Sequence, residues 1–532
     1  MQERERVKST NCAWWVKRWS ELYPQKPAII FEENVTTYAD LDRRTRAVAT
    51  WLQTAGIEKG DRVVVLLENC PEFIELYLAC ARLGAIFVPL NYRLMAEEID
   101  YVIRNCRPRL VVWGNRVRAA IDHVHLAQYR PPLLPAMVGE VGIEDLARGI
   151  ADYAAETAAF EGQTPVLTPS LSPDDLEDPQ VIMYTSGTTG WPKGAVLTHR
   201  KTFFNCLNAD HFFDMGFHDV MLIALPLFHS GGLFIQATPS LYKGATIILH
   251  RRFDPQRAYD DIERFQVTKF QGVPTVFRAL LKIEQERRGH LESLAVAAIG
   301  GERVTPEIME QCGASGFPLR VVMGQTETSI LLWATQEEVK ERPGTVGRPV
   351  FHAEVDLMHE NGGPVETGAV GELVVRGSVT MKEYWQDPEL TETVMAGGWL
   401  RTGDLARRDE DGYYYLVDRV KDVYTSAGEN VYPAEVERIL SQHPDVAEVA
   451  VVGVPDQEFG EVGYAFVIPR EGAAVGHEPL ADWARGRLVD YKVPRYVSVV
   501  DEFPRTALGK VKKFLLRRDA LAHLSWATTE EA

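Results

Sequence analysis

The stretch that decides the fold is Val181–Arg200, VIMYTSGTTGWPKGAVLTHR. An apolar run leads into a loop of serine, threonine and glycine, and a second apolar run follows it. Glycine lets the backbone approach a ligand closely, while backbone N–H groups, hydroxyls and a lysine can donate to phosphate oxygens. The stretch therefore predicts a strand that ends in a phosphate-binding loop, whose candidate residues are Thr185, Ser186, Gly187, Thr188, Thr189, Gly190 and Lys193.

The loop differs from other nucleotide-binding signatures. A Walker A loop needs G-x-x-x-x-G-K-[ST], but the only Gly-Lys pair is Gly509-Lys510, with Pro504 where the first glycine should stand. No two glycines are spaced i, i+2, which excludes the Rossmann fingerprint. GxSxG and HExxH are absent as well, so the usual α/β-hydrolase and zincin signatures are missing.

The loop lies within a repeating pattern of strand-like and helix-like segments. Helices are predicted from Pro71 to Gly84 and over 96–106. Short apolar, β-branched runs predict strands over 62–67, 85–90, 109–113, 220–225, 245–249, 294–299 and 319–323. Strands that alternate with helices indicate a parallel sheet covered by helices. Residues 114–180 are less regular, and we expect loops and surface helices there.

The pattern changes in the last third of the chain. From about residue 344, glycines and short strands dominate, which predicts a small β-rich subdomain. Beyond Lys421 a compact α+β pattern follows: helices over 434–440 and 479–489, and strands over 447–453, 463–468 and 496–500. These changes place a boundary near 419–422, and the predicted domains are 1–419 and 420–532.

Composition and charge exclude several classes of protein. The chain has 532 residues, with 57 Lys plus Arg against 75 Asp plus Glu, so the formal net charge is −18. This acidic balance argues against a nucleic-acid partner or an anionic membrane, because both favour a positive surface. The six cysteines form no CxxC pair, the first residues contain no apolar core of signal-peptide length, and no apolar run reaches membrane-spanning length. We expect a cytoplasmic protein without integral membrane association; peripheral membrane contact stays open.

The stretch Thr185–Gly194, TSGTTGWPKG, resembles the signature loop of the acyl-adenylate-forming (AMP-binding) enzymes, including acyl-CoA synthetases, peptide-synthetase adenylation domains and firefly luciferase. Further segments resemble the family's motifs in the family's order: Leu225–Gly232, Gly300–Glu302, Met323–Thr328, Thr402–Leu405, Asp418–Asp422, Ser426–Glu437 and Pro504–Lys510. The resemblance implies an α/β fold. Its large N-terminal domain would hold two parallel α/β sheet subdomains and a small β-barrel-like subdomain, followed by a small mobile α+β C-terminal domain.

The resemblance also implies roles for residues before the hinge. Thr326 would contact the nucleotide phosphate, and Glu327 would hold Mg²⁺, with Thr185 as a second candidate ligand. Carboxylate oxygen suits Mg²⁺ bridging phosphates. Met323 stands where the family usually has an aromatic residue, which puts stacking on adenine there in doubt. The remaining candidates are Gly301, Glu302 and Gln325 beside the nucleotide, His229 as the gate of the acid site, and Asp404 on the ribose hydroxyls.

Four residues complete the candidate site by the same resemblance. Arg419 would contact ribose and phosphate, and Lys421 would be the hinge about which the C-terminal domain rotates. Gly428 lies in the loop that approaches the pantetheine arm of coenzyme A in family members. Lys510 would be the catalytic lysine, since a mobile ammonium can stabilise the negative charge that develops during adenylation.

These residues predict an ATP-dependent acid–CoA ligase. The acid attacks the α-phosphate of ATP, giving acyl-AMP and pyrophosphate, and the thiol of coenzyme A then displaces AMP. The expected cofactors are ATP, Mg²⁺ and the co-substrate coenzyme A. Ser230, Gly231 and Gly232 leave volume beside His229, and Val273, Phe277, Ile330 and Leu331 would add an apolar wall. These features favour a medium or long-chain fatty acid or an aromatic acid over acetate, and we expect a medium or long-chain fatty acid first.

Several alternatives remain. The acid could instead be aromatic, and the acceptor could be a carrier protein charged by a stand-alone ligase. A luciferase-like oxygenase is a further family alternative. A different class, a nucleotide-binding protein without catalysis, is disfavoured by the intact Lys510, Glu327 and Arg419. A homodimer is left open.

Overall fold

The structure is a computed structural model that describes residues 10–122, 124, 134–163, 176–185, 191–283, 291–302, 304–505 and 509–530, the last six by their backbone only. The chain divides into two compact units. One comprises Met1–Val355 with Val375–Leu400, and the other comprises Asp356–Val374 with Arg401–Ala532. The division predicted at 419/420 falls inside the second unit and stays a prediction.

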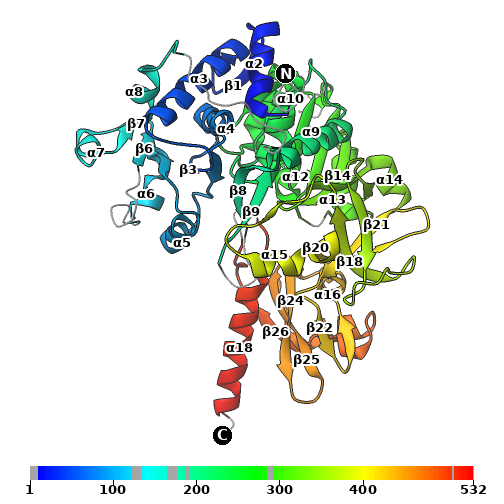
Figure 1. Cartoon of the computed structure of the whole chain (residues 1–532). Helices are drawn as coiled ribbons and strands as arrows, with labels where there is room; N and C mark the ends of the chain where they lie inside the picture. Colours follow the sequence, from blue (N-terminus) through cyan, green and yellow to red (C-terminus); the bar gives the residue numbers. More distant parts are fainter. Residues whose placement is uncertain are drawn as a thin grey trace. The chain divides into compact units, whose positions relative to one another are not determined.

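The first unit contains a sheet of eight strands (Figure 1). In sheet order they are β19 (Glu383–Tyr384), β9 (Lys193–Thr198), β8 (Pro179–Thr185), β4 (Ile86–Pro89), β3 (Arg62–Leu66), β5 (Leu110–Gly114), β6 (Leu134–Val138) and β7 (Ala151–Asp152). Strands β8 to β7 pair in parallel, whereas β9 and β19 are antiparallel additions at one edge. The four last residues of β3 are buried, as expected for a central parallel strand whose two faces are both covered.

Helices cover this sheet. They are α2 (Cys12–Leu22), α3 (Tyr38–Thr54), α4 (Pro71–Leu83), α5 (Ala96–Cys106), α6 (Arg118–Ile121), α7 (Ile143–Ala147) and α8 (Tyr153–Ala158). Helix α4 begins with Pro71 in its first turn and ends at Gly84, whose φ of 69° is left-handed. It packs with α2 and α3, while α5 packs with α6. The predicted helices of this region are thus confirmed nearly to the residue.

The expectation of loops and surface helices over 114–180 was incomplete. Besides short helices, the described part of this segment contains β6 and β7, which extend the sheet beyond β5. Strand β6 is LPAMV, five residues with only two that are fully buried. Such a short run has no clear alternation, so its pairing with β5 decides that it is a strand.

A second sheet of the first unit has nine strands. In order they are β16 (Arg348–Pro349), β15 (Ser329–Thr335), β14 (Leu319–Gln325), β13 (Val296–Gly300), β12 (Lys269–Gly272), β10 (Val220–Ile223), β11 (Thr246–Leu249), β1 (Pro27–Phe31) and β2 (Asn34–Thr37). The six strands from β14 to β1 are parallel. The strands β15, β16 and β2 are antiparallel to their neighbours.

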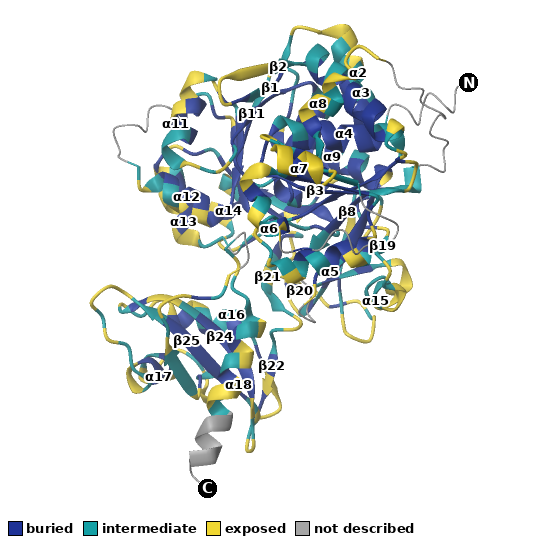
Figure 2. Cartoon of the chain, turned by 90° about the vertical axis from the view of Figure 1, so that its left-hand side faces the viewer, coloured by how far each residue is buried: buried dark blue, intermediate teal, exposed yellow. Residues whose placement is uncertain are grey.

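The helical segments around this sheet are α9 (His199–Phe213), the π-helix η4 (Gly231–Ala237), α10 (Thr238–Lys243), α11 (Pro255–Arg264), α12 (Pro274–Leu281), α13 (Pro306–Ala314) and α14 (Gln336–Glu341). A hydrophobic core joins β10, β12, β13 and β14 to α11, α12 and α13. Figure 2 shows buried strands in the interior of the unit and exposed residues on the outer sides of α11, α12 and α13. A short helix, α15 (Pro388–Val394), follows β19.

The second unit holds two smaller sheets. One has the order β17 (Glu354–Met358), β18 (Val370–Arg376), β20 (Leu400–Arg408) and β21 (Tyr414–Arg419). The other has the order β23 (Glu429–Val431), β22 (Tyr424–Ser426), β25 (Gly460–Pro469) and β24 (Val446–Asp456), with β26 (Tyr496–Val499) beside β25. Its helices are α16 (Pro433–Leu440), α17 (His477–Arg485) and α18 (Lys513–Glu530). The predicted α+β pattern after Lys421 is confirmed.

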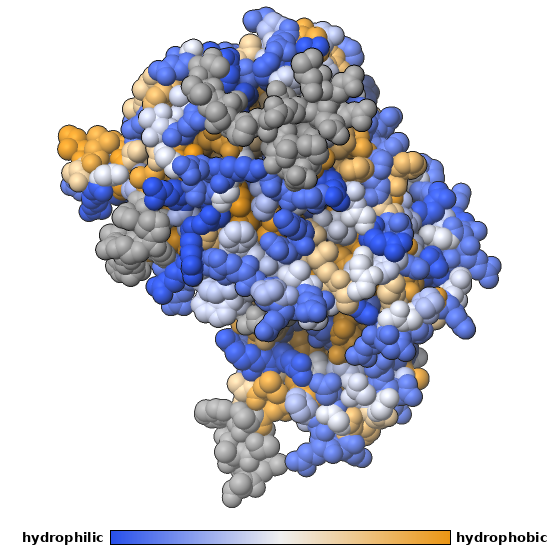
Figure 3. Space-filling model, in the orientation of Figure 1, coloured by the Kyte–Doolittle hydropathy of each residue, from blue (hydrophilic) through white to orange (hydrophobic). Residues whose placement is uncertain are grey.

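The predicted fold class is confirmed: mixed α/β sheets form the large N-terminal part, and a small α+β domain ends the chain. All six cysteines are buried free thiols. Among the described residues, no helix combines the length and apolarity needed to cross a membrane. Most residues on the face shown in Figure 3 are hydrophilic, in keeping with the acidic composition.

Candidate active site

The predicted phosphate loop connects two antiparallel strands. Thr185 ends β8, Lys193 begins β9, and the two residues are paired in register. The Thr185 hydroxyl donates to the Lys193 carbonyl oxygen across 3.5 Å. The residues Ser186, Gly187, Thr188, Thr189 and Gly190 lie outside the described residues. The structure therefore shows the base of the predicted loop, with Thr185 and its hydroxyl before the loop and Lys193 and its ammonium after it.

The predicted metal ligand stands on a tight turn between β14 and β15. The backbone N–H of Gln325 donates to the hydroxyl of Thr328, which closes the turn at 3.2 Å. Thr326 is buried at the tip, and Glu327 beside it is half-buried. A Cβ at Gly324 would lie 1.9 Å from the Ser329 carbonyl oxygen, so only glycine fits before the turn. The motif predicted from sequence is therefore a structural turn that presents Glu327.

Tyr384 holds Glu327, and no sequence motif had identified it. Its hydroxyl donates to Oε1 of Glu327 at 2.8 Å, and the backbone N–H of Met381 donates to the Glu327 carbonyl oxygen at 2.7 Å. The Lys193 ammonium lies 5.8 Å from the centroid of the Tyr384 ring. Because β19 pairs with β9, this tyrosine joins the loop base to the predicted metal ligand. Only the strand pairing reveals this contact.

Glu327 fits the predicted Mg²⁺. Among the described residues, no three His, Cys, Asp or Glu side chains converge as a metal-binding group. Mg²⁺ is commonly held by one or two carboxylates together with substrate phosphates, so a single acid beside a phosphate loop satisfies that pattern. A carboxylate that accepts one hydrogen bond keeps further acceptor capacity.

Lys201 is a second residue that the sequence motifs did not identify. It lies in the first turn of α9, directly after β9, and only 1% of its surface is exposed. Its ammonium donates to the hydroxyl of Ser329 at 2.5 Å. Burial lowers the pKa of Lys201 to about 7, and the negative charge of Glu327 opposes that shift. A buried lysine with so low a pKa, beside the predicted metal ligand, is typical of a functional region.

The predicted Gly300–Glu302 segment is a turn at the end of β13. A Cβ at Gly300 would lie 2.0 Å from the Val322 carbonyl oxygen. Gly301 has a φ of +82°, and a Cβ there would approach Val273 Cγ1 to 3.2 Å. Both glycines are therefore required by the backbone. Glu302 follows them and is half-buried.

The gate predicted at His229 lies just before the π-helix η4. Its Nδ1 accepts from the backbone N–H of Gly231 at 3.1 Å, which assigns the proton of a neutral ring to Nε2. His229 is half-buried. π-Helical turns are rare and frequently occur at functional sites.

The volume expected beside His229 is absent at Gly232. A Cβ on Gly232 would lie 2.4 Å from the Pro226 carbonyl oxygen, and one on Gly231 would lie 3.3 Å from Leu225 Cδ1. The small residues are therefore required by the close approach of η4 to the segment before it. They do not open space for the acid, so the argument from volume, which applied to long-chain and aromatic acids alike, loses its basis there.

In the second unit, two predicted nucleotide contacts face each other. Asp404 on β20 is the register partner of Arg419 on β21, and Arg419 Nε lies 2.7 Å from Asp404 Oδ1. Asp404 is buried, whereas the Arg419 side chain is 43% exposed. The pair fixes the orientation of the carboxylate. The guanidinium has further N–H donors for another partner.

The predicted hinge residue Lys421 and the predicted loop residue Gly428 are both exposed. Lys421 lies in a turn after β21, in which the N–H of Asp422 donates to the Arg419 carbonyl oxygen at 3.0 Å. Gly428 forms the two-residue tip of the β22–β23 hairpin with Ala427, and their φ values of 83° and 53° are typical of a type I′ turn. Thr506, Ala507 and Leu508 lie outside the described residues.

Lys510 lies in a loop that is closed by its neighbours. Arg505 and Val511 form an antiparallel bridge, and Arg505 donates to the Gly509 carbonyl oxygen at 2.9 Å. Arg505 also pairs with Glu448 at 2.5 Å. These contacts hold the ends of the loop and leave Lys510 exposed at its surface.

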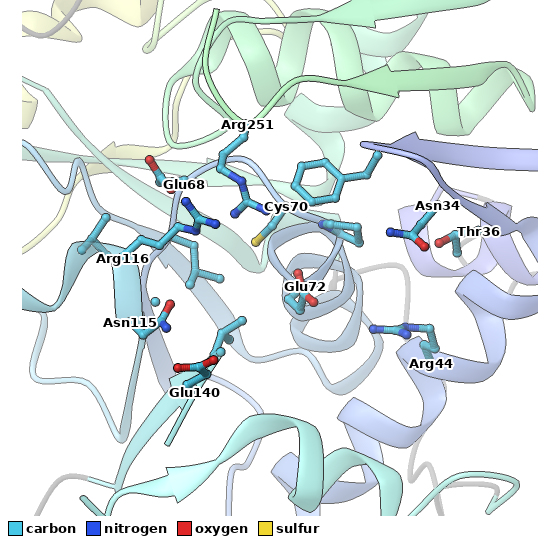
Figure 4. Close-up of a pocket in the computed structure, with 17 residues that line it drawn as sticks. Asn34, Thr36, Arg44, Glu68, Cys70, Glu72, Asn115, Arg116, Glu140 and Arg251 are labelled. Carbon is cyan, nitrogen blue, oxygen red and sulfur yellow. The ribbon is translucent and has the colours of Figure 1, made fainter. Parts of the chain in front are cut away.

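A separate cavity of 630 Å³ lies at the carboxyl ends of β3, β5 and β6 (Figure 4). In Figure 4, Arg116 and Arg251 extend toward Cys70 with Glu68 beside them, Glu72 lies near Cys70, and Arg44 lies farther along the lining. Much of this charge is already neutralised in ion pairs: Arg44 with Glu75, Arg251 with Glu32, and Glu68 with Arg252. None of the residues predicted for ATP, Mg²⁺ or the acid lines this cavity.

Comparison with known proteins assigns the family. Residues 16–385 match the AMP-binding enzyme family, and residues 435–510 match the AMP-binding enzyme C-terminal domain. The chain is 37% identical over 505 residues to a feruloyl-CoA synthase of Amycolatopsis sp, covering 95% of this chain and 98% of that protein. It is 36% identical over 500 residues to an indoleacetate–CoA ligase of Aromatoleum aromaticum, covering 94% and 96%.

A solved structure agrees along nearly the whole chain. The o-succinylbenzoate coenzyme A synthetase of Bacillus subtilis, in complex with ATP and magnesium ion, superimposes with a TM-score of 0.79 at 29% identity. The match covers 95% of this chain and 98% of that one. On these matches, the chain belongs to the AMP-binding, adenylate-forming enzyme family and is an ATP-dependent acid–CoA ligase.

Proposed function

We propose that this ligase activates an aromatic carboxylic acid as its acyl-adenylate and transfers the acyl group to coenzyme A. The observation that carries the adenylation half is the hydrogen bond from Tyr384 to Glu327, because it orients a half-buried carboxylate beside the base of the phosphate loop. Two similar relatives carry the names of aryl acids, feruloyl and indoleacetate, which favours an aromatic acid over the fatty acid that the sequence suggested.

In the first step, a carboxylate oxygen of the acid forms a bond to the α-phosphorus of ATP, and the bond from that phosphorus to the bridging oxygen breaks, releasing pyrophosphate. Thr185, Lys193 and the intervening residues Ser186–Gly190 bind the β- and γ-phosphates. Glu327, with Thr185 as the second candidate, holds Mg²⁺, which supplies charge neutralisation on the phosphates when bound. Lys510 stabilises the negative charge that develops at the reacting centre.

The remaining site residues position the nucleotide and the acid. Gly301, Glu302, Gln325 and Thr326 lie on two turns that follow the neighbouring strands β13 and β14. The carboxyl ends of parallel strands are the usual place for a ligand in such a sheet. Asp404, fixed by Arg419, accepts from the ribose hydroxyls, and Arg419 donates to ribose and phosphate oxygens. His229 lines the acid site.

In the second step, the thiol of coenzyme A loses its proton, its sulfur forms a bond to the acyl carbonyl carbon, and AMP leaves with the electron pair of the acyl–oxygen bond. The C-terminal residues beyond the boundary at 419/420 rotate about Lys421 between the two steps. This rotation withdraws Lys510 and brings Gly428 toward the nucleotide, which opens a path for the coenzyme A thiol. The cytoplasm as compartment and a homodimer as assembly stay predictions.

Pyrophosphate release with a panel of aryl and alkyl acids tests the proposal, measured with and without coenzyme A. An aryl acid–CoA ligase releases one pyrophosphate per enzyme rapidly without coenzyme A, and turns over only when the thiol is added. Turnover restricted to medium or long-chain alkyl acids would contradict the aromatic assignment. A burst without turnover on coenzyme A would indicate a carrier protein as acceptor, and no release with any acid would indicate a protein without catalysis.

A further inference from the structure

Lys201 belongs to a group of buried polar side chains that the proposed mechanism does not use. Lysine is almost never fully buried unless it is paired, yet this one is covered by α9, η4 and the start of β15. Its ammonium lies 5.6 Å from the centroid of the Phe234 ring in η4 and donates to the Ser329 hydroxyl. Ser329 directly precedes Ile330 and Leu331, two residues predicted to line the acid site.

Three uncharged side chains lie in the same region. Asn205 is one turn after Lys201 on the same face of α9, and its amide nitrogen donates to the Phe234 carbonyl oxygen. Gln236 lies two residues after Phe234, and its amide nitrogen donates to the Gly231 carbonyl oxygen at 3.1 Å. Ser230 directly precedes η4. We refer to Lys201, Asn205, Ser230 and Gln236 as the polar cluster.

Three atoms of the polar cluster have no hydrogen-bond partner among the described residues. They are Asn205 Oδ1, Gln236 Oε1 and Ser230 Oγ. Their side chains are at least 97% buried, with exposed fractions of 0%, 0% and 3%. A buried polar atom without a partner costs about 1–3 kcal/mol, and native proteins keep few of them without a reason. Three such atoms around one π-helix indicate that another molecule completes their hydrogen bonds.

The hydrogen-bond donors and acceptors of the polar cluster specify which chemical group would bind there. The amide nitrogens of Asn205 and Gln236 each donate one N–H to a backbone carbonyl oxygen, and their amide oxygens are acceptors without a partner among the described residues. Two acceptors disfavour a second carboxylate, which could only accept. They equally disfavour a methyl group, which would leave them unpaired. A hydroxyl donates to one amide oxygen and accepts from Lys201, so it satisfies both kinds of partner.

We propose that the polar cluster binds a hydroxyl group on the ring of the aromatic acid, with Lys201 as the donor that determines this specificity. The inference rests on the proposed acid-activating function, because it names a substituent of the acid that this function activates.

The experiment compares two acids that differ only in the ring hydroxyl, 4-hydroxycinnamate and cinnamate, and a second pair, 4-hydroxyphenylacetate and phenylacetate. The readout is the ratio of kcat/KM for the hydroxylated acid to that for its parent, from pyrophosphate release. We expect the wild type to prefer a hydroxylated acid by about 10- to 100-fold, the range of one hydrogen bond to a charged donor. Lys201→Met, which keeps the length but loses the donor, should reduce that ratio about tenfold or more.

Two further variants make the comparison specific. Asn205→Leu removes an acceptor and should also lower the ratio. Arg200→Met is the matched control, because Arg200 is the neighbouring residue, is exposed, and pairs with Glu177 outside the cluster. Its ratio should equal that of the wild type. Since the ratio compares two acids on one variant, partial misfolding does not change it. For a variant inactive on both acids, the ratio of their calorimetric dissociation constants replaces it.

The outcomes separate this inference from the proposed function. No pyrophosphate release from the wild type with any acid would overturn the proposed function and this inference together. Release with aryl acids, but no preference for the hydroxyl in either pair, would overturn the inference alone. A preference that survives unchanged in Lys201→Met would likewise overturn it, and would leave the polar cluster a hydrated part of the core.

Discussion

The phenol of Tyr384 hydrogen-bonds to Glu327 at 2.8 Å, and the ring of the same residue lies 5.8 Å from the ammonium of Lys193. One side chain therefore joins the base of the predicted phosphate loop to the carboxylate that we propose for Mg²⁺. The contact depends on the pairing of β19 with β9, two strands that are far apart in the sequence. This arrangement makes Tyr384 a positioning residue, because it acts through Glu327.

We expect Tyr384→Phe to weaken adenylation about 10-fold or more, since a hydrogen bond to a charged group contributes about 1.5–3 kcal/mol. The effect should appear mainly as a higher half-saturating concentration of Mg²⁺, because the ring and its packing remain. Tyr259→Phe is the control, as Tyr259 lies in the hydrophobic core around α11 and α12 and its hydroxyl donates to the Leu280 carbonyl oxygen at 3.4 Å. An unchanged Mg²⁺ dependence in Tyr384→Phe would show that the bond does not position Glu327.

Lys510→Ala should slow acyl-AMP formation about 10²–10³-fold, the usual effect of removing one group that stabilises developing charge. Thioester formation from supplied acyl-AMP and coenzyme A should change far less, because no phosphate bond is made in that step. Single-turnover kinetics of the two half-reactions measure both effects. Arg505→Lys, five residues before Lys510 in the same loop, is the control for effects of a disturbed loop. Equal losses in both half-reactions would contradict a role confined to adenylation.

Lys421→Pro should leave adenylation largely intact and stop the coenzyme A step. Proline fixes φ near −65°, so a turn that must change its dihedral angles could no longer do so. Lys421 is exposed, so loss of its side chain removes little buried surface. The expected record is one burst of pyrophosphate per enzyme without steady turnover, and Lys421→Ala should turn over normally. Steady thioester production by the proline variant would remove Lys421 from the hinge role.

Gly232→Ala should destabilise the protein by about 1–3 kcal/mol, the usual cost of overpacking. The added Cβ would meet the Pro226 carbonyl oxygen at 2.4 Å, and backbone cannot move aside as a side chain can. Thermal unfolding measures the loss. Gly216→Ala is the matched control, because its Cβ would meet only Asp219 Oδ2 at an ordinary 3.7 Å. Equal melting temperatures for the two variants would disprove the close contact.

Lys201 should make stability depend on pH in a definite direction. Its pKa is about 7 when folded and about 10.5 when unfolded, so between these values the unfolded chain binds more protons. Wild-type stability should therefore rise with pH across this window, relative to Lys201→Met, which has no such group. The stability advantage of the methionine variant should be largest below pH ~7 and shrink toward pH ~10. Denaturant unfolding at both limits checks this, and a constant difference would contradict the lowered pKa.

The sequence by itself determined the elements that are specified by the residues within one short segment. Helix α4 was predictable because a proline opens it, an apolar spacing runs through it, and Gly84 closes it in a left-handed conformation. The segments at Gly300–Gly301 and Gly324–Thr328 were identified by their resemblance to family motifs, and their glycines have a local cause. A Cβ at Gly300 or Gly324 would meet a backbone carbonyl oxygen, and Gly301 has a positive φ. The order of the motifs then indicated the family, which the comparisons confirm.

Only the tertiary structure decided which side chains meet. Tyr384 reaches Glu327 because β19 pairs with β9, and Lys201 reaches Ser329 because α9 packs beside β15. Gly232 looked like open volume in the sequence, yet it faces the backbone of Pro226. A sequence pattern records the period and composition of one segment, whereas these contacts join segments that are distant in the chain. Their energies are set by burial and strand pairing, which exist only once the sheets have formed.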